Sequence, residues 1–262
     1  MNRPEPIDSE RILRHGVVAA VEFHPRLGST NDQAMRRAGE PSVALPLVVV
    51  AAEQTAGRGR EGRRWWSGPG GLAMSLLIDG DAYGGSGRFA PLVAPAAGLA
   101  VVDCAERLLG AHPSVEHLGL HWPNDVFIDG GKLAGVLVEV LGRRAVIGVG
   151  LNTNNTACEA PEELRAKVRT LRDLTGRTFD PTDVLVELLG ALRRRLDMLR
   201  EGPDRLAAAA DARCLQRGRR LHVQSGAERL EGICRGIAPS GALVLETPLG
   251  ARHVHSGTVL PD

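Results

Sequence analysis

The sequence contains very little lysine. Lys132 and Lys167 are the only lysines among the 32 basic residues, and all the others are arginine. The compact ammonium of a lysine that binds phosphate is not easily replaced by a planar guanidinium. In a chain that otherwise uses arginine, each of the two lysines is therefore a candidate for such a role. Aromatic residues are equally scarce, at 3%. The three tryptophans, Trp65, Trp66 and Trp122, lie in the two polar segments described below, either as site residues or as ordinary core anchors.

Cysteine clusters, long apolar runs and an excess of charge are also missing. No Cys-x-x-Cys pair and no Cys/His group at zinc spacing occurs, which favours reduced thiols. Residues 1–16 lack the apolar core of a secretory signal and no apolar run is long enough for a membrane span, so we expect a cytoplasmic protein. With 32 basic and 31 acidic residues, the net charge of +1 does not steer the chain toward nucleic acid or membranes.

Length and composition indicate a globular protein of one or two domains. The 262 residues are 43% hydrophobic and 24% charged, which is enough for a sizeable core. After about residue 214, short alternating runs separated by Gly, Pro and Ser replace a helical pattern, and this rhythm is typical of a small β-barrel. We therefore expect two domains, at residues 1–213 and 214–262.

The hydrophobic pattern of the first part predicts both strands and helices. The expected strands lie at 16–23, 46–54 and 72–78, and the expected helices at 30–39, 88–109 and within 161–214. Ser29 or Thr30 can cap the first of these helices, and Asp180 followed by proline can cap the last. Turns at 129–131 and 141–143 join three short strands into an antiparallel meander.

The segment GRGREG at residues 57–62 has the spacing of a dinucleotide-binding loop. That interpretation fails because Arg63, Arg64, two tryptophans and a Gly/Pro run follow and cannot open a helix. No Walker motif is present either. A flexible loop with three glycines and several arginines can close over an anion, using backbone N–H groups and guanidinium forks as donors. The alternative is a solvated basic loop.

A second motif, His121-Trp122-Pro123-Asn124-Asp125, stands seven residues before Lys132. A hairpin between them brings Asp125 and Lys132 to one end of the same sheet. The two form either a structural ion pair or a functional pair, and the scarcity of lysine favours the functional pair.

A third cluster, Ser29-Thr30-Asn31, lies at a strand-to-helix junction. These side chains can simply cap the helix. Together with Gln54 they can also present donors and acceptors to a neutral polar group of a ligand.

In this order, the segments GSTN, EQTAGRGREGRRW, WPND, KLAG and GVGLN resemble the biotin protein ligases, and GICRGIAPSGALVLE resembles their small C-terminal domain. The resemblance implies an α+β fold: a mixed, largely antiparallel sheet with helices, like class II aminoacyl-tRNA synthetases and biotin/lipoate ligases, plus a C-terminal SH3-like β-barrel. It also implies an enzyme that forms biotinyl-5′-AMP from biotin and ATP with Mg²⁺ and releases pyrophosphate. The biotin then passes to a lysine of a biotin carboxyl carrier protein of a biotin-dependent carboxylase.

The resemblance also assigns roles to residues. The catalytic set is Lys132, Arg58, Arg60 and Asp125. The biotin-binding set is Ser29, Thr30, Asn31, Gln54, Gly57, Arg58, Gly59, Arg60 and Lys132. The ATP-binding set is Arg58, Arg60, Asn124, Lys132 and Asn152. In this assignment the loop orders over biotin and phosphate, Lys132 contacts the biotin carboxylate and the α-phosphate, and Asp125 serves the transfer. No side chain is assigned to a metal, because ATP oxygens carry most of the magnesium coordination.

The chain departs from the family at two places. His121 stands where relatives commonly have Lys or Arg before WPND, so the charge at that position is partial at neutral pH. Only about 20 residues precede the first expected strand, which leaves no room for a winged helix-turn-helix, so we expect neither repressor activity nor DNA binding. A lipoate or octanoyl transferase and a non-enzymatic nucleic-acid binder are the competing hypotheses, and a homodimer is left open.

Overall fold

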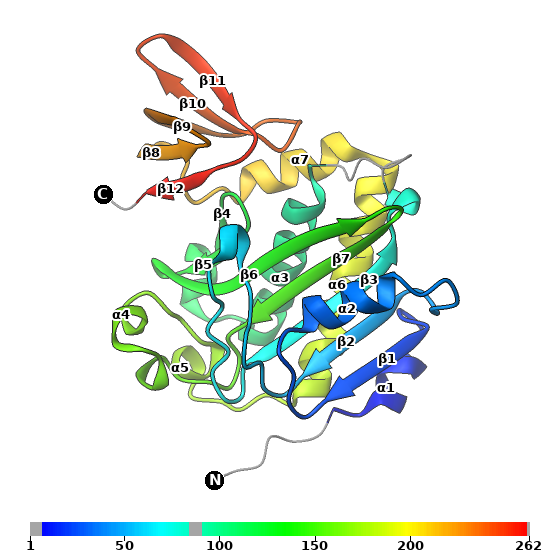
Figure 1. Ribbon diagram of the computed structural model, residues 1–262. Helices are drawn as coiled ribbons and strands as arrows, with labels where there is room; N and C mark the ends of the chain where they lie inside the picture. Colours follow the sequence, from blue (N-terminus) through cyan, green and yellow to red (C-terminus); the bar gives the residue numbers. More distant parts are fainter. Residues whose placement is uncertain (1–6, 84–90, 261–262) are drawn as a thin grey trace.

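The computed structural model describes residues 7–83 and 91–260. Figure 1 shows a large sheet with helices on both faces and a small sheet beside it. In the described chain the large sheet has seven strands in the order β1-β2-β3-β7-β6-β5-β4. These strands are β1 (Ala20–His24), β2 (Leu47–Ala51), β3 (Leu72–Asp79), β4 (Gly119–His121), β5 (Asp125–Ile128), β6 (Gly131–Leu141) and β7 (Arg144–Leu151). β1 and β2 are parallel and the other neighbouring pairs are antiparallel, so the sheet is mixed and largely antiparallel, as predicted.

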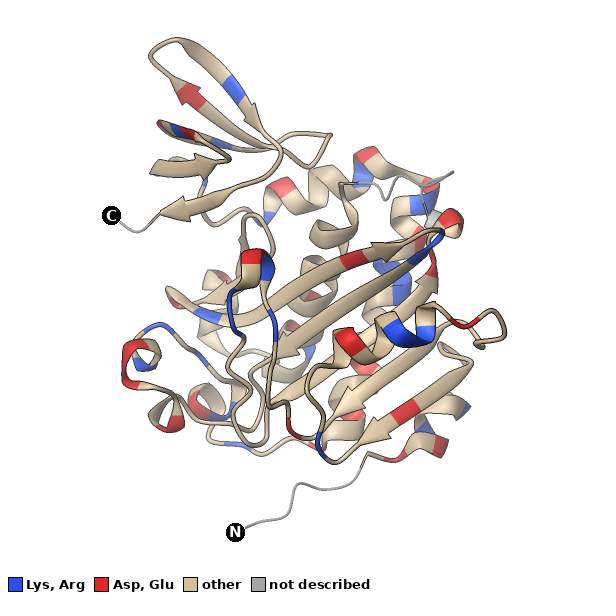
Figure 2. Ribbon diagram, in the orientation of Figure 1, with Lys and Arg blue, Asp and Glu red and all other residues tan. Residues whose placement is uncertain are grey.

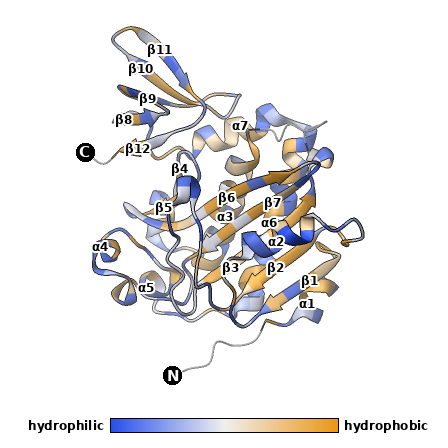
Figure 3. Cartoon of the chain, viewed as in Figure 1, coloured by the Kyte–Doolittle hydropathy of each residue, from blue (hydrophilic) through white to orange (hydrophobic). Residues whose placement is uncertain are grey.

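The helices cover the two faces of this sheet unequally. They are α1 (Ser9–Arg14), α2 (Thr30–Ala38), α3 (Val93–Leu109), α4 (Glu162–Arg165), α5 (Leu171–Thr175), α6 (Pro181–Glu201) and α7 (Pro203–Ala212). On one face α3 and α6 bury the main core, which includes Ile147 and Val149 of β7. On the opposite face α2 packs a smaller core, in which Ala34 meets Val49 of β2. The sheet strands between these layers are largely apolar (Figure 3), because both of their faces are covered.

Local sequence signals explain where the main helices begin and end. The Ser29 side chain accepts a hydrogen bond at the start of α2, and Gly39 caps its end, as predicted. The Asp180 side chain caps α6 in the same way, ahead of a proline at the first helical position. Pro95 is tolerated in α3 because it lies in the first turn, where a backbone N–H has no partner within the helix.

The C-terminal part of the chain is a separate antiparallel sheet. Its order within the described residues is β11-β10-β9-β8-β12. The strands are β8 (Arg220–Ser225), β9 (Glu228–Ile237), β10 (Leu243–Thr247), β11 (Gly250–Val254) and β12 (Thr258–Leu260). Helix α7 follows α6 and leads to this small sheet (Figure 1). The α+β architecture followed by an all-β unit agrees with the prediction.

Several boundaries differ from those that the sequence suggested. The first strand begins at Ala20 and not at residue 16, because the unpredicted α1 precedes it and Gly16 turns the chain with φ of 67°. The described part of the predicted 88–109 helix begins at Val93, and residues 88–90 lie outside the described residues. The meander gains β4 as a further strand.

All four cysteines are free, as predicted. Among the helices that the structure describes, none combines the length and apolar character needed to cross a membrane.

Candidate active site

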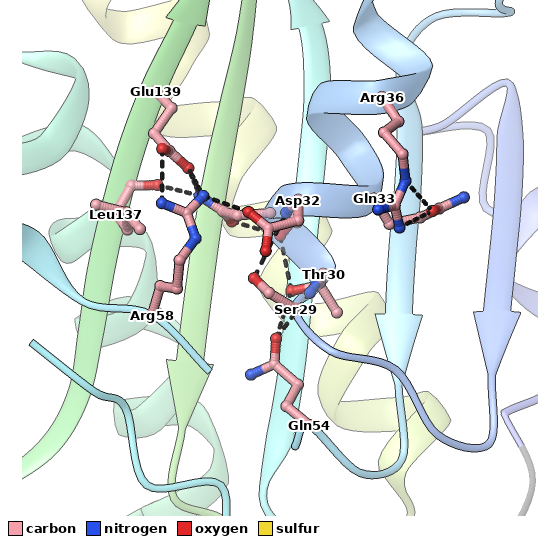
Figure 4. A network of polar contacts seen from close by, with 11 residues as sticks. Ser29, Thr30, Asp32, Gln33, Arg36, Gln54, Arg58, Leu137 and Glu139 are labelled. Atoms are coloured by element: carbon pink, nitrogen blue, oxygen red, sulfur yellow. Dashed lines mark hydrogen bonds and ion pairs between the residues drawn. The ribbon is translucent and has the colours of Figure 1, made fainter. Parts of the chain in front are cut away.

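The N-terminus of α2 holds three consecutive polar side chains against the large sheet. Ser29, Thr30 and Asn31 are each only 3–4% exposed. The Thr30 backbone N–H and Oγ1 donate to Gln54 Oε1 at 2.8 and 3.1 Å (Figure 4). Ser75 Oγ of β3 donates to Asn31 Oδ1 at 2.6 Å. Ser29 therefore caps the helix, while Thr30 and Asn31 join a hydrogen-bond network that reaches Gln54 and β3. The three side chains can cap the helix and still offer polar groups to a ligand.

Residues 57–65, which we call the flap, fold back as a narrow hairpin in front of the large sheet. Trp65 N donates to Gly57 O at 2.9 Å across the hairpin. Glu61 and Gly62 form its turn with φ of 56° and 73°, a left-handed conformation that glycine adopts without strain. Figure 2 shows basic and acidic residues gathered on this segment. The arginine-rich loop is thus a hydrogen-bonded hairpin and not an irregular connection.

Lys132 and Asp125 meet across the turn between β5 and β6, as their spacing predicted. Lys132 Nζ lies 2.8 Å from Asp125 Oδ1 and 5.4 Å from the centroid of the Trp65 ring. Both charged side chains are mostly buried, with exposed fractions of 32% and 21%. The ammonium is therefore held between a carboxylate and an aromatic face.

Glycines in β6 and β7 make room for the side chains on this face. A Cβ at Gly150 would lie 2.7 Å from Trp65 Cζ2, and one at Gly148 would lie 2.8 Å from Asn31 Cγ. Gly135 stands opposite Gly150 in the strand register and also lies under the indole of Trp65. Sequence reasoning missed these three glycines. Glycine inside a strand is nonetheless a signal that another part of the chain approaches closely.

A cavity lies between the start of α2, the flap and strands β6 and β7. Most of the predicted site residues line it, namely Ser29, Thr30, Asn31, Gln54, Arg58, Gly59, Arg60, Asn124, Asp125 and Lys132. Residues from five separate stretches of sequence therefore meet at one place.

Two predicted residues stand next to the cavity wall and support it. Asn152 is 3% exposed, and its Nδ2 donates to the backbone oxygen of Lys132 at 3.3 Å. Gly57 packs against the flap, since a Cβ there would lie 2.8 Å from Trp65 O. Asn152 and Gly57 therefore contact residues that line the cavity, and they are not lining residues themselves.

Arg58 is held by two carboxylates that sequence reasoning did not identify. Its Nη1 and Nη2 donate to Glu139 Oε1 and Oε2 at 3.0 and 2.7 Å, and Nη2 lies 2.7 Å from Asp32 Oδ1. The pKa of Arg58 is raised, mainly by the hydrogen bond to Glu139. Figure 4 shows the guanidinium between the two acidic side chains. Glu139 follows Arg58 by 81 residues, so no local pattern could connect them.

His121 packs into the sheet and does not supply the permanent positive charge that a lysine or arginine at this position would carry. Burial lowers its pKa, and nearby Asp125 opposes that shift only in part. Its ring stacks on Phe127 with centroids 4.3 Å apart. The position therefore carries less charge at neutral pH than an unperturbed histidine.

Comparison with known proteins decides the family. A model described as the biotin/lipoate A/B protein ligase family matches residues 23–153, and one described as the biotin protein ligase C terminal domain matches residues 218–260. The biotin–(acetyl-CoA-carboxylase) ligase of Mycobacterium tuberculosis is 36% identical, over 95% of this chain and 92% of its own length. The chain belongs to the biotin protein ligase family.

Further similarities support this membership. The biotin–(acetyl-CoA-carboxylase) ligase of Paracoccus denitrificans is 33% identical over 89% of this ligase chain and 97% of its own. The solved structure of the Aquifex aeolicus biotin protein ligase in complex with biotin and ATP superposes with a TM-score of 0.79 and 26% identity. It covers 92% of this chain and 98% of the other. The family resemblance and the α+β fold predicted from the motifs are confirmed.

Proposed function

We propose that this chain activates biotin with ATP to give biotinyl-5′-AMP and pyrophosphate, and then transfers biotin to a lysine of a biotin carboxyl carrier protein. The observation that carries this proposal is the cavity in which Ser29, Thr30, Asn31 and Gln54 meet Lys132. Such a site can hydrogen-bond a neutral polar ring and neutralise the anions that react. Relatives named as biotin ligases, and a similar structure bound to biotin and ATP, support the same reaction.

The polar end of the cavity fits the ureido group of biotin. The amide of Asn31 is fixed on both sides, because its Oδ1 accepts from Ser75 at 2.6 Å and its Nδ2 donates to Glu139 at 2.8 Å. Gln54 is fixed by the two hydrogen bonds from Thr30. Side chains that are already oriented lose little entropy when a ligand binds, so we assign the ureido contacts to Ser29, Thr30, Asn31 and Gln54.

The cationic part of the cavity fits the first reaction step. The biotin carboxylate attacks the α-phosphorus of ATP, a new O–P bond forms and pyrophosphate leaves, so two anions must approach each other. A cation about 4 Å from such an anion stabilises it by about 4 kcal/mol at the effective dielectric constant of a protein surface. We assign this role to Lys132 and Arg60. The nearest acid to Arg60 is Glu61 at 3.9 Å, so the charge of Arg60 is only weakly paired.

Asn124 and Asn152 complete the proposed nucleotide side. Asn124 Nδ2 donates to Val136 O at 2.6 Å, which fixes its side chain at the cavity wall. Asn152 would act from behind the wall through the backbone of Lys132.

Asp125 suits the second step. The amine of the carrier lysine must be neutral when it attacks the carbonyl carbon of the mixed anhydride, and AMP leaves as the C–O bond breaks. Asp125 lines the cavity and can orient the incoming ammonium and accept its proton. The flap, with Gly57, Arg58, Gly59 and Arg60, would keep water from the labile intermediate in the interval.

Magnesium enters this proposal as part of the substrate MgATP. Within residues 7–83 and 91–260, no group of three His, Cys, Asp or Glu side chains is placed to hold a metal ion. A hard cation takes oxygen ligands, and the ATP phosphates supply them. We also propose that residues 1–213 form the catalytic domain and 214–262 the C-terminal domain, because α7 ends at Ala212 and β8 begins at Arg220.

The proposal is tested by incubating the purified chain with biotin, MgATP and a biotin carboxyl carrier domain. We expect mass spectrometry to show one biotin on the carrier lysine, and biotin-dependent pyrophosphate release when the carrier is omitted. A carrier without its acceptor lysine is the control for the second step. Labelling with lipoate in place of biotin, or no labelling under conditions in which the Mycobacterium tuberculosis relative labels the same carrier, would refute the proposal.

A further inference from the structure

Glu139 joins two parts of the cavity that are far apart in sequence. Both of its carboxylate oxygens accept hydrogen bonds from Arg58 of the flap, at 3.0 and 2.7 Å. One of them, Oε2, also accepts from Asn31 Nδ2 at 2.8 Å. The Glu139 side chain is 26% exposed, so these contacts are only partly open to water. One carboxylate on β6 therefore contacts both the flap and the start of α2.

The positive charge of Arg58 is already paired with the carboxylates of Glu139 and Asp32. Its guanidinium faces Glu139 in a bidentate pair and Asp32 at 2.7 Å, so one positive charge meets two negative ones. A phosphate or carboxylate ligand that approached Arg58 would meet a cluster with a net negative charge. Lys132 and Arg60 differ from Arg58, because Lys132 has a single carboxylate partner and Arg60 has a distant one.

Because Arg58 belongs to the flap, its contact with Glu139 also restrains the flap. Arg58 forms a backbone bridge with Arg64, so it belongs to the first arm of the flap hairpin. Holding its side chain on β6 holds that arm over the cavity, and Figure 4 shows Arg58 reaching from the flap to Glu139 on the sheet. The bidentate geometry fixes direction as well as distance.

We propose that Glu139 is a positioning residue which, with Asp32, anchors Arg58 and so keeps the flap closed over the biotin-binding residues. In this account Arg58 is the anchor of the flap, and Lys132 and Arg60 supply the positive charge that faces the ligand. The role in retaining an adenylate rests on the proposed function. The anchoring itself does not, because it is a property of the ligand-free chain.

The experiment compares Glu139→Gln, Arg58→Gln and the double variant with wild type. Glu40→Gln is the matched control, because Glu40 also pairs with an arginine, Arg37, at 2.6 Å, and that arginine belongs to α2 and not to the flap. The first measurement is tryptic cleavage within the flap of the ligand-free protein, read by mass spectrometry at the bonds after Arg60, Arg63 and Arg64, which every variant retains. The second is the rate at which preformed biotinyl-AMP leaves the enzyme, with the melting temperature as the control for folding.

We expect Glu139→Gln to accelerate both flap cleavage and biotinyl-AMP release about tenfold, a modest value because solvent screens the pair. The rate of adenylate formation at saturating substrate and the melting temperature should stay close to wild type. In flap cleavage the double variant should be no worse than Arg58→Gln alone, because both changes remove the same contact between the flap and β6. Glu40→Gln should match wild type in every measurement.

Three results would overturn the inference. The first is wild-type cleavage and retention in Glu139→Gln, and the second is an additive increase of flap cleavage in the double variant, which would mean that the two residues act separately on the flap. The third is a large loss of adenylate formation in Arg58→Gln while Glu139→Gln is normal, which would place Arg58 on the ligand. If wild type forms no biotinyl-AMP, the proposed function fails, and the cleavage measurement still decides whether Glu139 holds the flap.

Discussion

Replacing Gly148 by alanine should destabilise the protein and weaken biotin binding, although the change adds only one methyl group. The new Cβ would overlap Asn31 Oδ1 and lie 2.8 Å from Asn31 Cγ. Asn31 cannot yield easily, because it is 4% exposed and its amide contacts Ser75 at 2.6 Å, Glu139 at 2.8 Å and Leu137 O at 3.3 Å. Moving the amide breaks two or three buried or partly buried hydrogen bonds, each worth about 1 kcal/mol, so we expect a loss of about 2–3 kcal/mol.

Urea denaturation measures the loss in unfolding free energy, and titration calorimetry measures biotin affinity. An Asn31→Ala background removes the three atoms nearest to the new Cβ, which all belong to the Asn31 amide, so the double variant should be no less stable than Asn31→Ala alone. Gly28→Ala is the control, because a Cβ at Gly28 has no atom within 4 Å. Wild-type stability and biotin affinity in Gly148→Ala, or additive losses in the double variant, would show that the strand glycine does not serve Asn31.

Three other predictions concern the charged groups of the site. Lys132→Ala should slow biotin-dependent pyrophosphate release by about 10²-fold or more, the usual cost of removing one donor to a developing charge, and unchanged release would reject its role. Asp125→Asn should form biotinyl-AMP but fail to label the carrier, and normal labelling in a gel assay would remove Asp125 from the transfer step. Because burial lowers the pKa of His121 below its ordinary 6.5, the unfolded chain binds more protons there just below that pH, and stability should fall as pH drops. His121→Gln should flatten this fall between about pH 7 and pH 5.5 in urea denaturation, and an equal slope in both proteins would contradict it.

Local features of the fold followed directly from sequence. The cap at Ser29, the proline after Asp180 and the turn at 129–131 were predicted, because each depends on the conformational preferences of a few adjacent residues. The spacing of Asp125 and Lys132 on a tight hairpin also fixed their ion pair. By contrast α1 was missed, because it is a single short helix that gains its stability from packing on the rest of the chain.

The conformation of the flap was not predicted from sequence. Its glycines and arginines indicated a flexible anion-binding loop, and the structure shows a hairpin tied to β6 through Arg58 and Glu139. The composition of a loop describes what it can contact but not which contact it makes. Trp65 lies over Gly135 and Gly150 for a similar reason, since only the pairing of β6 with β7 brings those glycines together.

The sequence by itself determined the family, the order of the motifs and the chemical types of the groups at the site, because these depend on residue identity and short spacing. Only the tertiary structure decided which charges from distant parts of the chain pair. Glu139 neutralises Arg58 from 81 residues away, whereas Lys132 at the cavity wall pairs with Asp125, its neighbour on the hairpin. Electrostatic interactions depend on distance in space and on burial, and for residues far apart in sequence neither can be read from their positions along the chain.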